Sequence, residues 1–274
     1  MTDRYAVIGN PIVQSKSPQI HGFFAAATRQ DLEYTKVEGP LDGFAAAVRA
    51  FRDSGGRGMN VTAPFKLEAY EMADERSQRA QLAGAVNAMK FEADGRILAE
   101  NFDGIGLVKD IVHNHGVALR GKRVLILGAG GAVRGALQPF LAEQPAELVI
   151  ANRDAAKSAQ LAEQFAPHGK LRGGGYGDIG NGRFDVVVNG TSASLRAELP
   201  AVSPEVFAAD CLAYELAYGK GLTPFLRLAQ NAGVKRLADG VGMLVEQAAE
   251  AFLWWRGVRP DTSALIREMT IPLK

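Results

Sequence analysis

Gly121-Lys-Arg-Val-Leu-Ile-Leu-Gly-Ala-Gly-Gly-Ala132 begins the stretch of sequence that decides the fold, and the stretch continues to Asn152. Its apolar run 123–127 has the length of a buried strand and is too short for a helix. A glycine turn follows, then a helical pattern over 132–141 and a second apolar strand over 146–150. A strand, a glycine turn, a helix and a strand in this order lay a pyrophosphate on the amides of a helix N-terminus. The stretch therefore predicts a dinucleotide site in a Rossmann-type domain.

The glycine turn matches the pattern G-x-G-x-x-G only in part, because Gly128 and Gly130 are present while Val133 occupies the third glycine position. A glycine cluster after a strand can be no more than a tight turn. Here the flanking elements favour nucleotide binding, and small residues let the backbone approach a phosphate closely. The residues expected to bind the cofactor at this turn are Gly128, Ala129, Gly130, Gly131 and Ala132.

The end of the second strand indicates which dinucleotide binds. An NAD site usually has Asp or Glu here for the ribose 2′-hydroxyl, whereas an NADP site has positive charge. The chain has Asn152 and Arg153, with Lys157 one helical turn further on. A guanidinium can hold a 2′-phosphate with two parallel hydrogen bonds, so NADP is favoured. In the alternatives, Asp154 caps the next helix and both cations are solvated, or Asp154 binds the ribose and favours NAD.

Composition restricts the class of protein. The chain has 274 residues, 47% of them hydrophobic, which suits one large or two modest domains with a sizeable core. Lys+Arg 31 against Asp+Glu 30 gives a net charge of +1, which does not favour a nucleic-acid partner.

The sequence has no apolar run of membrane-spanning length and no signal-peptide pattern, so a cytoplasmic protein is expected. Cys211 lies in an apolar run as an expected inert thiol, and the four histidines show no metal-site spacing.

Strands alternate with helices along the whole chain, which implies parallel sheets with both faces covered. A seam is expected at 116–121, and the glycines 173–175 are expected to form at most a flexible loop. The long helix 243–256 is expected to return to the first domain. The prediction is an α/β protein with two domains and a cleft between them: 1–102 plus 243–274 as the substrate domain, and 103–242 as the dinucleotide domain.

Several polar residues could carry chemistry, each with a plainer explanation. Lys66 falls in the first turn of a helix, where a cation opposes the helix dipole. This position suits a lysine that exchanges a proton. An exposed lysine without a function is the simpler explanation. Asp103 begins a helix and could be a simple N-cap. Ser15 and Ser17 lie near a helix N-terminus that could bind a carboxylate, with capping the default for Ser17. Asn87 could be a turn residue, and Gln247 could face water.

Taken together, these segments resemble the shikimate dehydrogenase family over nearly the whole chain. The resemblance rests on blocks in a fixed order: 6–12 with 15–18, Asn60-Val-Thr-Ala-Pro-Phe-Lys66, Gly84-Ala-Val-Asn87, Asn101-Phe-Asp-Gly-Ile-Gly106, 128–132, Asn152-Arg153, Asn189-Gly-Thr-Ser192, Tyr218-Gly-Lys220, 223–225 and Gly242-Met-Leu-Val-Glu-Gln247.

The resemblance implies the reversible, NADP-dependent reduction of 3-dehydroshikimate to shikimate, with Lys66 and Asp103 as the catalytic pair. It implies that Ser15 and Ser17 hold the substrate carboxylate. The ring hydroxyls would be held by Thr62, Asn87, Asp103, Tyr218 and Gln247, and the cofactor also by Thr191, Leu216 and Gly240. The expected partner is a small-molecule substrate, and the protein is expected to be a monomer or a homodimer.

The chain departs from the family pattern at a few positions. Phe102 replaces the usual Thr beside Asp103 and is expected among the substrate-binding residues, where it would alter the polarity or shape of the pocket. Gln14, Ala63, Asp154 and Leu216 also differ from the usual residues. A divergent paralogue is therefore expected, and two alternatives stay open. One is an enzyme that acts on quinate or a related hydroxylated cyclohexane carboxylate and could use NAD. The other is a ligand-binding regulator with the same fold.

Overall fold

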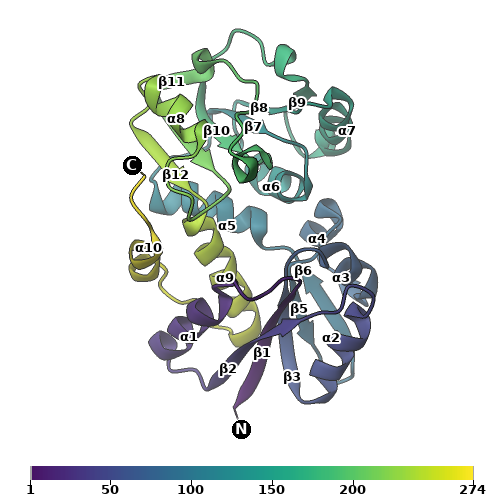
Figure 1. The fold of residues 1–274 in the computed structure, drawn as a ribbon. Coiled ribbons are helices and arrows are strands. Elements are labelled where there is room, and N and C mark those ends of the chain that lie inside the picture. The colour runs from purple at the N-terminus through teal and green to yellow at the C-terminus, as the bar shows by residue number, and fades with distance from the viewer. Residues whose placement is uncertain (1, 274) are drawn as a thin grey trace. The chain divides into compact units, whose positions relative to one another are not determined.

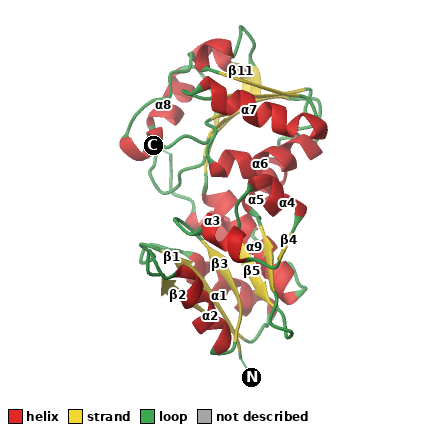
Figure 2. Ribbon diagram, turned by 90° about the vertical axis from the view of Figure 1, so that its right-hand side faces the viewer, coloured by secondary structure: helices red, strands yellow, loops and turns green. Residues whose placement is uncertain are grey.

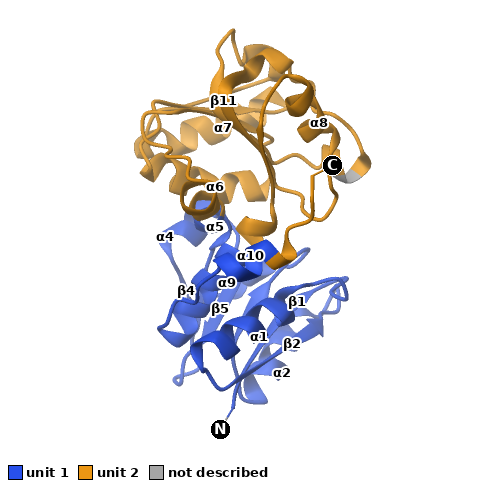
Figure 3. Ribbon diagram, turned by 90° about the vertical axis from the view of Figure 1, so that its left-hand side faces the viewer, with its two compact units in different colours: residues 1–106, 245–267 blue, residues 107–244, 268–274 orange. Residues whose placement is uncertain are grey.

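The computed structural model describes residues 2–273, apart from the side chain of Leu195. The chain forms two compact units (Figures 1 and 3): unit 1 contains 1–106 and 245–267, and unit 2 contains 107–244 and 268–274. The division differs slightly from the expected domain limits. Residues 103–106 belong to unit 1, where a Cβ on Gly106 would lie 2.7 Å from the backbone nitrogen of Gln247. Residues 268–274 belong to unit 2, where Leu273 packs against the core.

Unit 1 is built on a six-stranded sheet of order β2-β1-β3-β5-β6-β4. The strands are β1 (Asp3–Gly9), β2 (Leu32–Glu38), β3 (Gly56–Val61), β4 (Glu75–Arg76), β5 (Ala88–Phe91) and β6 (Ile97–Glu100). The helices are α1 (Ser17–Thr28), α2 (Phe44–Asp53), α3 (Lys66–Met72), α4 (Gln78–Ala83), α5 (Asp103–Lys109, continued by a π turn, Asp110–Asn114), α9 (Val241–Arg256) and α10 (Ser263–Met269); α5, α9 and α10 each extend into unit 2.

The expectation of parallel strands throughout is wrong for this sheet, because β5 is antiparallel to both β3 and β6. The turn at Ala93-Asp-Gly95 is too short for a crossover, and strands joined so closely can pair only in antiparallel fashion. The two faces of the sheet bury different side chains. Ala6 and Ile8 of β1 belong to the core formed with α2 and α3, while Tyr5 stacks on Trp255 of α9, with ring centroids 4.7 Å apart. Helices thus cover both faces.

Unit 2 contains a six-stranded sheet of order β12-β11-β10-β7-β8-β9 in which every pair is parallel. Figure 2 shows α6 and α7 on one side of this sheet and α8 on the other. The strands are β7 (Arg123–Leu127), β8 (Glu147–Ala151), β9 (Leu171–Gly174), β10 (Phe184–Asn189), β11 (Phe207–Glu215) and β12 (Arg236–Asp239). The helices are α6 (Gly131–Ala142), α7 (Ala155–Phe165) and α8 (Pro224–Asn231), with 3-10 turns at Ala166–His168, Tyr176–Asp178, Ala193–Arg196 and Pro204–Val206.

The prediction of a flexible loop at 173–175 is wrong, because Gly173 and Gly174 belong to β9, an edge strand paired with β8. Helix α7 lies so close to this strand that a Cβ on Gly173 would sit 2.0 Å from the backbone oxygen of Ser158. The Ser158 hydroxyl also donates a hydrogen bond of 2.6 Å to the carbonyl oxygen of Gly174. The glycines allow this contact between helix and strand and do not provide flexibility.

The order of the strands locates a site in unit 2. The chain winds outward from β7 through β8 to β9, and in the opposite direction from β10 through β11 to β12. Where the winding direction reverses, between β7 and β10, the loops at the carboxyl ends of the strands diverge and leave a crevice. Among residues 2–273, no helix is both long and apolar enough to cross a membrane.

Candidate active site and nucleotide site

One edge of the unit 1 sheet gathers the polar residues that the sequence analysis singled out. Ser15 and Ser17 follow β1, and Thr62 follows β3, which is parallel to β1. Asn87 precedes β5, which runs antiparallel to β3, so its start lies at the same edge. Asp103 follows β6, which is antiparallel to β5 and therefore also ends there. Residues far apart in sequence are thus brought to one edge by strand direction alone.

The Lys66 ammonium donates a hydrogen bond to Asp103 Oδ2 and forms an ion pair with it. The Lys66 side chain is one-third exposed and that of Asp103 only 13%. Asn87 Nδ2 donates to Asp103 Oδ1 at 2.8 Å and to Gln247 Oε1 at 3.2 Å. A lysine, a carboxylate and two amides therefore form one hydrogen-bonded group, which excludes the water-facing alternative for Gln247. Such a group can hold a hydroxyl and exchange its proton.

The side chain of Asp103 does not serve as the helix cap. Asn101 Oδ1 accepts the Asp103 N–H at 3.1 Å and takes the capping role instead. Asn101 is itself fixed through a hydrogen bond of 3.0 Å from its Nδ2 to the Ala85 carbonyl oxygen. The carboxylate of Asp103 is left to bind Lys66 and Asn87.

The default expectation that Ser17 caps its helix is wrong. Helix α1 begins at Ser17, its N-cap position is Lys16, and no side chain caps it. The Ser15 hydroxyl donates to the Ser17 hydroxyl at 3.2 Å and accepts the Ser17 N–H at 3.3 Å. Two hydroxyls thus lie side by side at the start of a twelve-residue helix, where backbone N–H groups favour an anion.

Phe102 occupies a different environment from the one expected of a substrate ligand. Its side chain belongs to an apolar cluster with Ala88 and Ala251, and its ring packs edge-on against Trp254 at a centroid distance of 5.8 Å. The residue is only 4% exposed. What Phe102 contributes to the polar group is its backbone N–H, which Asn87 Oδ1 accepts at 2.8 Å. The ring acts on the site through packing.

Phe102→Thr is therefore expected to destabilise the protein by about 3 kcal/mol, because the substitution leaves a cavity and puts a hydroxyl among apolar side chains. Urea unfolding followed by circular dichroism measures this loss. Phe23→Thr, at a half-buried phenylalanine of α1, is the control and should cost clearly less. An equal loss in both variants would contradict the importance of the packing around Phe102.

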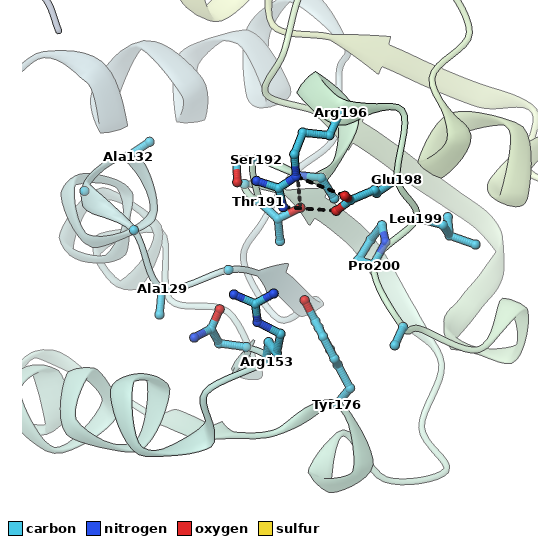
Figure 4. Close-up of a pocket in the computed structure, with 17 residues that line it drawn as sticks. Ala129, Ala132, Arg153, Tyr176, Thr191, Ser192, Arg196, Glu198, Leu199 and Pro200 are labelled. Carbon is cyan, nitrogen blue, oxygen red and sulfur yellow. Dashed lines mark hydrogen bonds and ion pairs between the residues drawn. The ribbon is translucent and has the colours of Figure 1, made fainter. Parts of the chain in front are cut away.

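The second site is a pocket of about 530 Å³ in unit 2, at the switch point of the sheet (Figure 4). Its floor is the backbone of two glycines. Gly128 has φ +109°, which favours glycine, and a Cβ there would lie 2.9 Å from the carbonyl oxygen of Gly190. At Gly130 and Gly131 a Cβ would meet nothing within 4 Å. The start of α6 therefore offers backbone N–H groups and free space, which is what a pyrophosphate requires.

Most residues that the sequence analysis assigned to the cofactor line this pocket. They are Gly128, Ala129, Gly130, Gly131, Ala132, Asn152, Arg153 and Thr191. Lys157 is not among the lining residues; its Nζ lies 3.9 Å from Asp154 Oδ2. Asp154 Oδ1 accepts the Ala156 N–H at 3.2 Å and caps α7, as one of the alternatives proposed. This capping bond engages one oxygen of the Asp154 carboxylate.

The pocket has further lining residues that carry no recognisable motif and were not predicted. They include Tyr176, Arg196, Glu198 and Leu199. Figure 4 shows Arg153 and Tyr176 on one side and the Arg196–Glu198 pair on the other. Arg196 holds Glu198 by two bonds, of 3.1 and 3.0 Å, and this lowers the pKa of Glu198. Burial raises the pKa of Tyr176, while the nearby charge of Arg153 acts to lower it.

The three remaining candidates lie in the turns after β11 and β12. Tyr218 is 41% exposed. The Asp239 carboxylate at the end of β12 accepts the N–H of Gly219, next to Tyr218, at 3.1 Å. Leu216 and Gly240 touch, because a Cβ on Gly240 would lie 2.1 Å from the Leu216 carbonyl oxygen. Neither Leu216 nor Gly240 is among the residues that line the 530 Å³ pocket.

Two further expectations concern cysteine and metals. Cys211 is buried in β11, and burial raises the pKa of its thiol to about 12, as expected of an inert cysteine. Within residues 2–273, no group of three or more His, Cys, Asp or Glu side chains is arranged to hold a metal ion.

Known families and relatives match both units of the chain. Residues 7–89 match the shikimate dehydrogenase substrate binding domain, 107–196 match the shikimate/quinate 5-dehydrogenase family, and 240–269 match the shikimate 5'-dehydrogenase C-terminal domain. A curated relative, the shikimate dehydrogenase (NADP(+)) of Janthinobacterium sp. (strain Marseille), is 56% identical over 98% of this chain and 97% of its own length.

Solved structures agree with these matches. An Ael1 enzyme from Pseudomonas putida is 65% identical, with a TM-score of 0.95 over 100% of both chains. The shikimate 5-dehydrogenase of Thermus thermophilus, solved in complex with NADP(H) and shikimate, is 30% identical, with a TM-score of 0.84 over 97% of this chain and 98% of its own. With this level of identity over the full length and matching models across both units, the chain belongs to the shikimate dehydrogenase family.

Proposed function

We propose that this protein is an NADP-dependent shikimate dehydrogenase that reversibly reduces 3-dehydroshikimate to shikimate. The proposal rests on one observation above all, the contact of Lys66 with Asp103 in a group completed by Asn87 and Gln247. Curated relatives that are 50–56% identical over nearly the full length bear the name shikimate dehydrogenase (NADP(+)). A protein that only binds a ligand has no need of a proton-exchanging lysine paired with a carboxylate.

Lys66 and Asp103 would form the proton-transfer pair. Oxidation of an alcohol requires a base to take the hydroxyl proton as the hydride leaves. In the oxidation direction Lys66 Nζ, as the neutral amine, would take the hydroxyl proton and become an ammonium, and Asp103 would hold that ammonium in place. Bound NADP would supply the hydride acceptor. Asn87, oriented by the backbone N–H of Phe102, would fix the carboxylate from the other side.

The remaining polar residues would bind the cyclohexene carboxylate. Ser15 and Ser17 would donate to its carboxylate at the N-terminus of α1. Thr62, Tyr218 and Gln247 would bind the ring hydroxyls, as the family resemblance implies. Since Phe102 is buried, we assign it a positioning role through its backbone and do not make it a direct substrate ligand.

The residues of the unit 2 pocket fit a dinucleotide phosphate. Gly130 and Gly131 leave open space at the N-terminus of α6, and Arg153 lines the same pocket. We assign the 2′-phosphate of NADP to Arg153. Lys157, which is paired with Asp154 outside the lining residues, would add only a more distant charge.

A matrix of kinetic measurements tests the proposed function. Shikimate and quinate are each oxidised with NADP and with NAD, and kcat/KM is compared. The combination of shikimate with NADP should exceed the other three by at least about tenfold, which corresponds to about 1.4 kcal/mol. A preference for quinate would favour the alternative substrate. NADPH binding without turnover of either substrate would favour a regulator. The cytoplasmic location and the monomeric or dimeric state stay predictions.

A further inference from the structure

A buried carboxylate that the proposed chemistry does not use lies at the end of β11. Glu215 is 0% exposed. Its Oε2 accepts hydrogen bonds from Asn189 Nδ2 at 2.9 Å, from Thr223 Oγ1 at 3.1 Å and from the Ser194 hydroxyl. Its Oε1 accepts the N–H of Ala217 at 3.3 Å. Burial raises the pKa of Glu215, and these four hydrogen bonds act in the opposite direction.

The contacts with Thr191 and with Glu215 together fix which way the amide of Asn189 points. Asn189 ends β10, next to β11, and is fully buried. Its Oδ1 accepts the N–H of Thr191 at 3.2 Å and the Thr191 hydroxyl at 2.8 Å. Because a backbone N–H can only donate, the Asn189 atom facing Thr191 must be the oxygen. The NH₂ group then faces Glu215, whose Oε2 accepts from it at 2.9 Å.

The same chain of hydrogen bonds continues into the nucleotide pocket. Thr191 Oγ1 accepts the N–H of Ala193 at 3.3 Å, which closes the turn that follows β10. Gly190, Thr191, Ser192 and Ala193 all line the pocket, and a Cβ on Gly128 of the glycine turn would lie 2.9 Å from the carbonyl oxygen of Gly190. The shape of this wall therefore depends on Asn189, and the orientation of Asn189 depends on Glu215.

We propose that Glu215 is a positioning residue for dinucleotide binding: it holds the Asn189 amide so that the turn 190–193 forms the wall of the NADP pocket. The proposal rests on the proposed function, since it concerns the cofactor site of that enzyme. Glu215 touches neither reacting group and lies among no pocket-lining residues. A carboxylate suits this position because three donors converge on one of its oxygens and a fourth reaches the other.

Exchange of the amide at position 189 and the carboxylate at position 215 tests this orientation. In Asn189→Asp, two carboxylates would meet at the distance of the present hydrogen bond, and we expect the NADPH Kd to rise about tenfold. In Glu215→Gln one of the four donors would face an N–H group, and the Kd should rise about threefold. In the double variant, the amide introduced at position 215 would donate to the carboxylate introduced at position 189. That carboxylate would still accept from Thr191, and the amide oxygen at position 215 would still accept from Ala217. The Kd should return to within about threefold of wild type.

The Kd is measured by NADPH fluorescence titration, and the melting temperature of each variant is measured alongside. Glu250→Gln is the control for loss of a buried carboxylate, because Glu250 accepts a hydrogen bond from Arg259 in unit 1. It should lower the melting temperature and leave the NADPH Kd unchanged. In every variant, kcat at saturating NADP should stay within about twofold of wild type, so the effect is confined to cofactor binding.

The proposal is overturned if the double variant binds NADPH no better than Asn189→Asp alone. It is also overturned if Asn189→Asp lowers the melting temperature but leaves the Kd within twofold of wild type, since the network would then serve only stability. Failure of the proposed function gives a different result, because the wild-type protein itself would then oxidise no shikimate with NADP or bind no NADPH, whatever the variants show.

Discussion

Lys66→Ala is expected to lower kcat for shikimate oxidation about a thousandfold, in the range typical of a lost general acid–base group. The substitution removes the ammonium that contacts Asp103 and leaves the remaining bonds of the site, from Asn87 to Asp103 and to Gln247, in place. The NADPH Kd should not change, because the dinucleotide pocket is lined by residues of unit 2 alone. Steady-state kinetics at 340 nm and a fluorescence titration measure the two quantities.

Lys90→Ala is the matched control for this loss. Lys90 is also a lysine of unit 1 paired with a carboxylate, since its Nζ lies 3.1 Å from Glu92 Oε1. The two side chains are about one-third exposed, and Lys90 lies within β5 and not at the strand end where Lys66 and Asp103 meet, so its removal should leave kcat within about twofold of wild type. A fully active Lys66→Ala enzyme would refute the catalytic role of Lys66.

Arg153→Ala is expected to raise the KM for NADP about thirtyfold and to leave the KM for NAD almost unchanged. A guanidinium bound to a phosphate forms charge-assisted hydrogen bonds worth about 2 kcal/mol, which corresponds to this factor. NAD lacks the 2′-phosphate, so removal of Arg153 should change the KM for NAD little. The ratio of kcat/KM for NADP and NAD, measured with saturating shikimate, reports the effect.

Arg196→Ala separates the specific role of Arg153 from the general charge of the pocket. Arg196 lines the same pocket, but Glu198 already binds its guanidinium through two hydrogen bonds. Its removal should change the NADP-to-NAD ratio by less than about threefold. If Arg196→Ala shifted the ratio as strongly as Arg153→Ala, the 2′-phosphate would have to be assigned to the other wall of the pocket.

Local patterns in the sequence were sufficient to predict the dinucleotide unit. The bounds of β7 agree with the apolar run 123–127, and α6 begins directly at the glycine turn. This succeeded because the strand, turn and helix are contiguous, and each is determined by its own residues. The other lining residues of the pocket were missed because Tyr176 and Glu198 come from separate loops without a pattern of their own.

The group around Lys66 could not be derived from local patterns. Lys66 and Asp103 are 37 residues apart, and Gln247 lies 160 residues from Asn87. They meet because β5 is antiparallel to its neighbours, which the alternation of strands and helices did not predict. From the sequence, only the resemblance to a family predicted that these residues form one site. The departure from the family pattern at Phe102 suggested a ring in the substrate pocket, whereas that ring is buried in an apolar cluster.

Ser17 and Gly173 illustrate a different limit. A Ser-Pro pair typically predicts an N-cap, yet α1 begins one residue earlier than that pattern requires, and the hydroxyl is left for other contacts. A run of glycines typically predicts a loop, yet at 173–174 it permits a close contact between helix and strand. At Gly173 the contact with Ser158 of α7 determines the role of the residue, and at both places local propensity alone gives the wrong answer.

A double-mutant cycle on Lys66 and Asp103 tests the central claim, that the two residues transfer the proton as one unit. The rate of NADPH oxidation by 3-dehydroshikimate in a single turnover is measured for wild type, Lys66→Ala, Asp103→Asn and the double variant. Residues that act as a unit show strongly non-additive losses, so the double variant should be about as slow as the slower single variant. If the two losses instead multiplied, Lys66 and Asp103 would act independently and the proposed mechanism would be wrong.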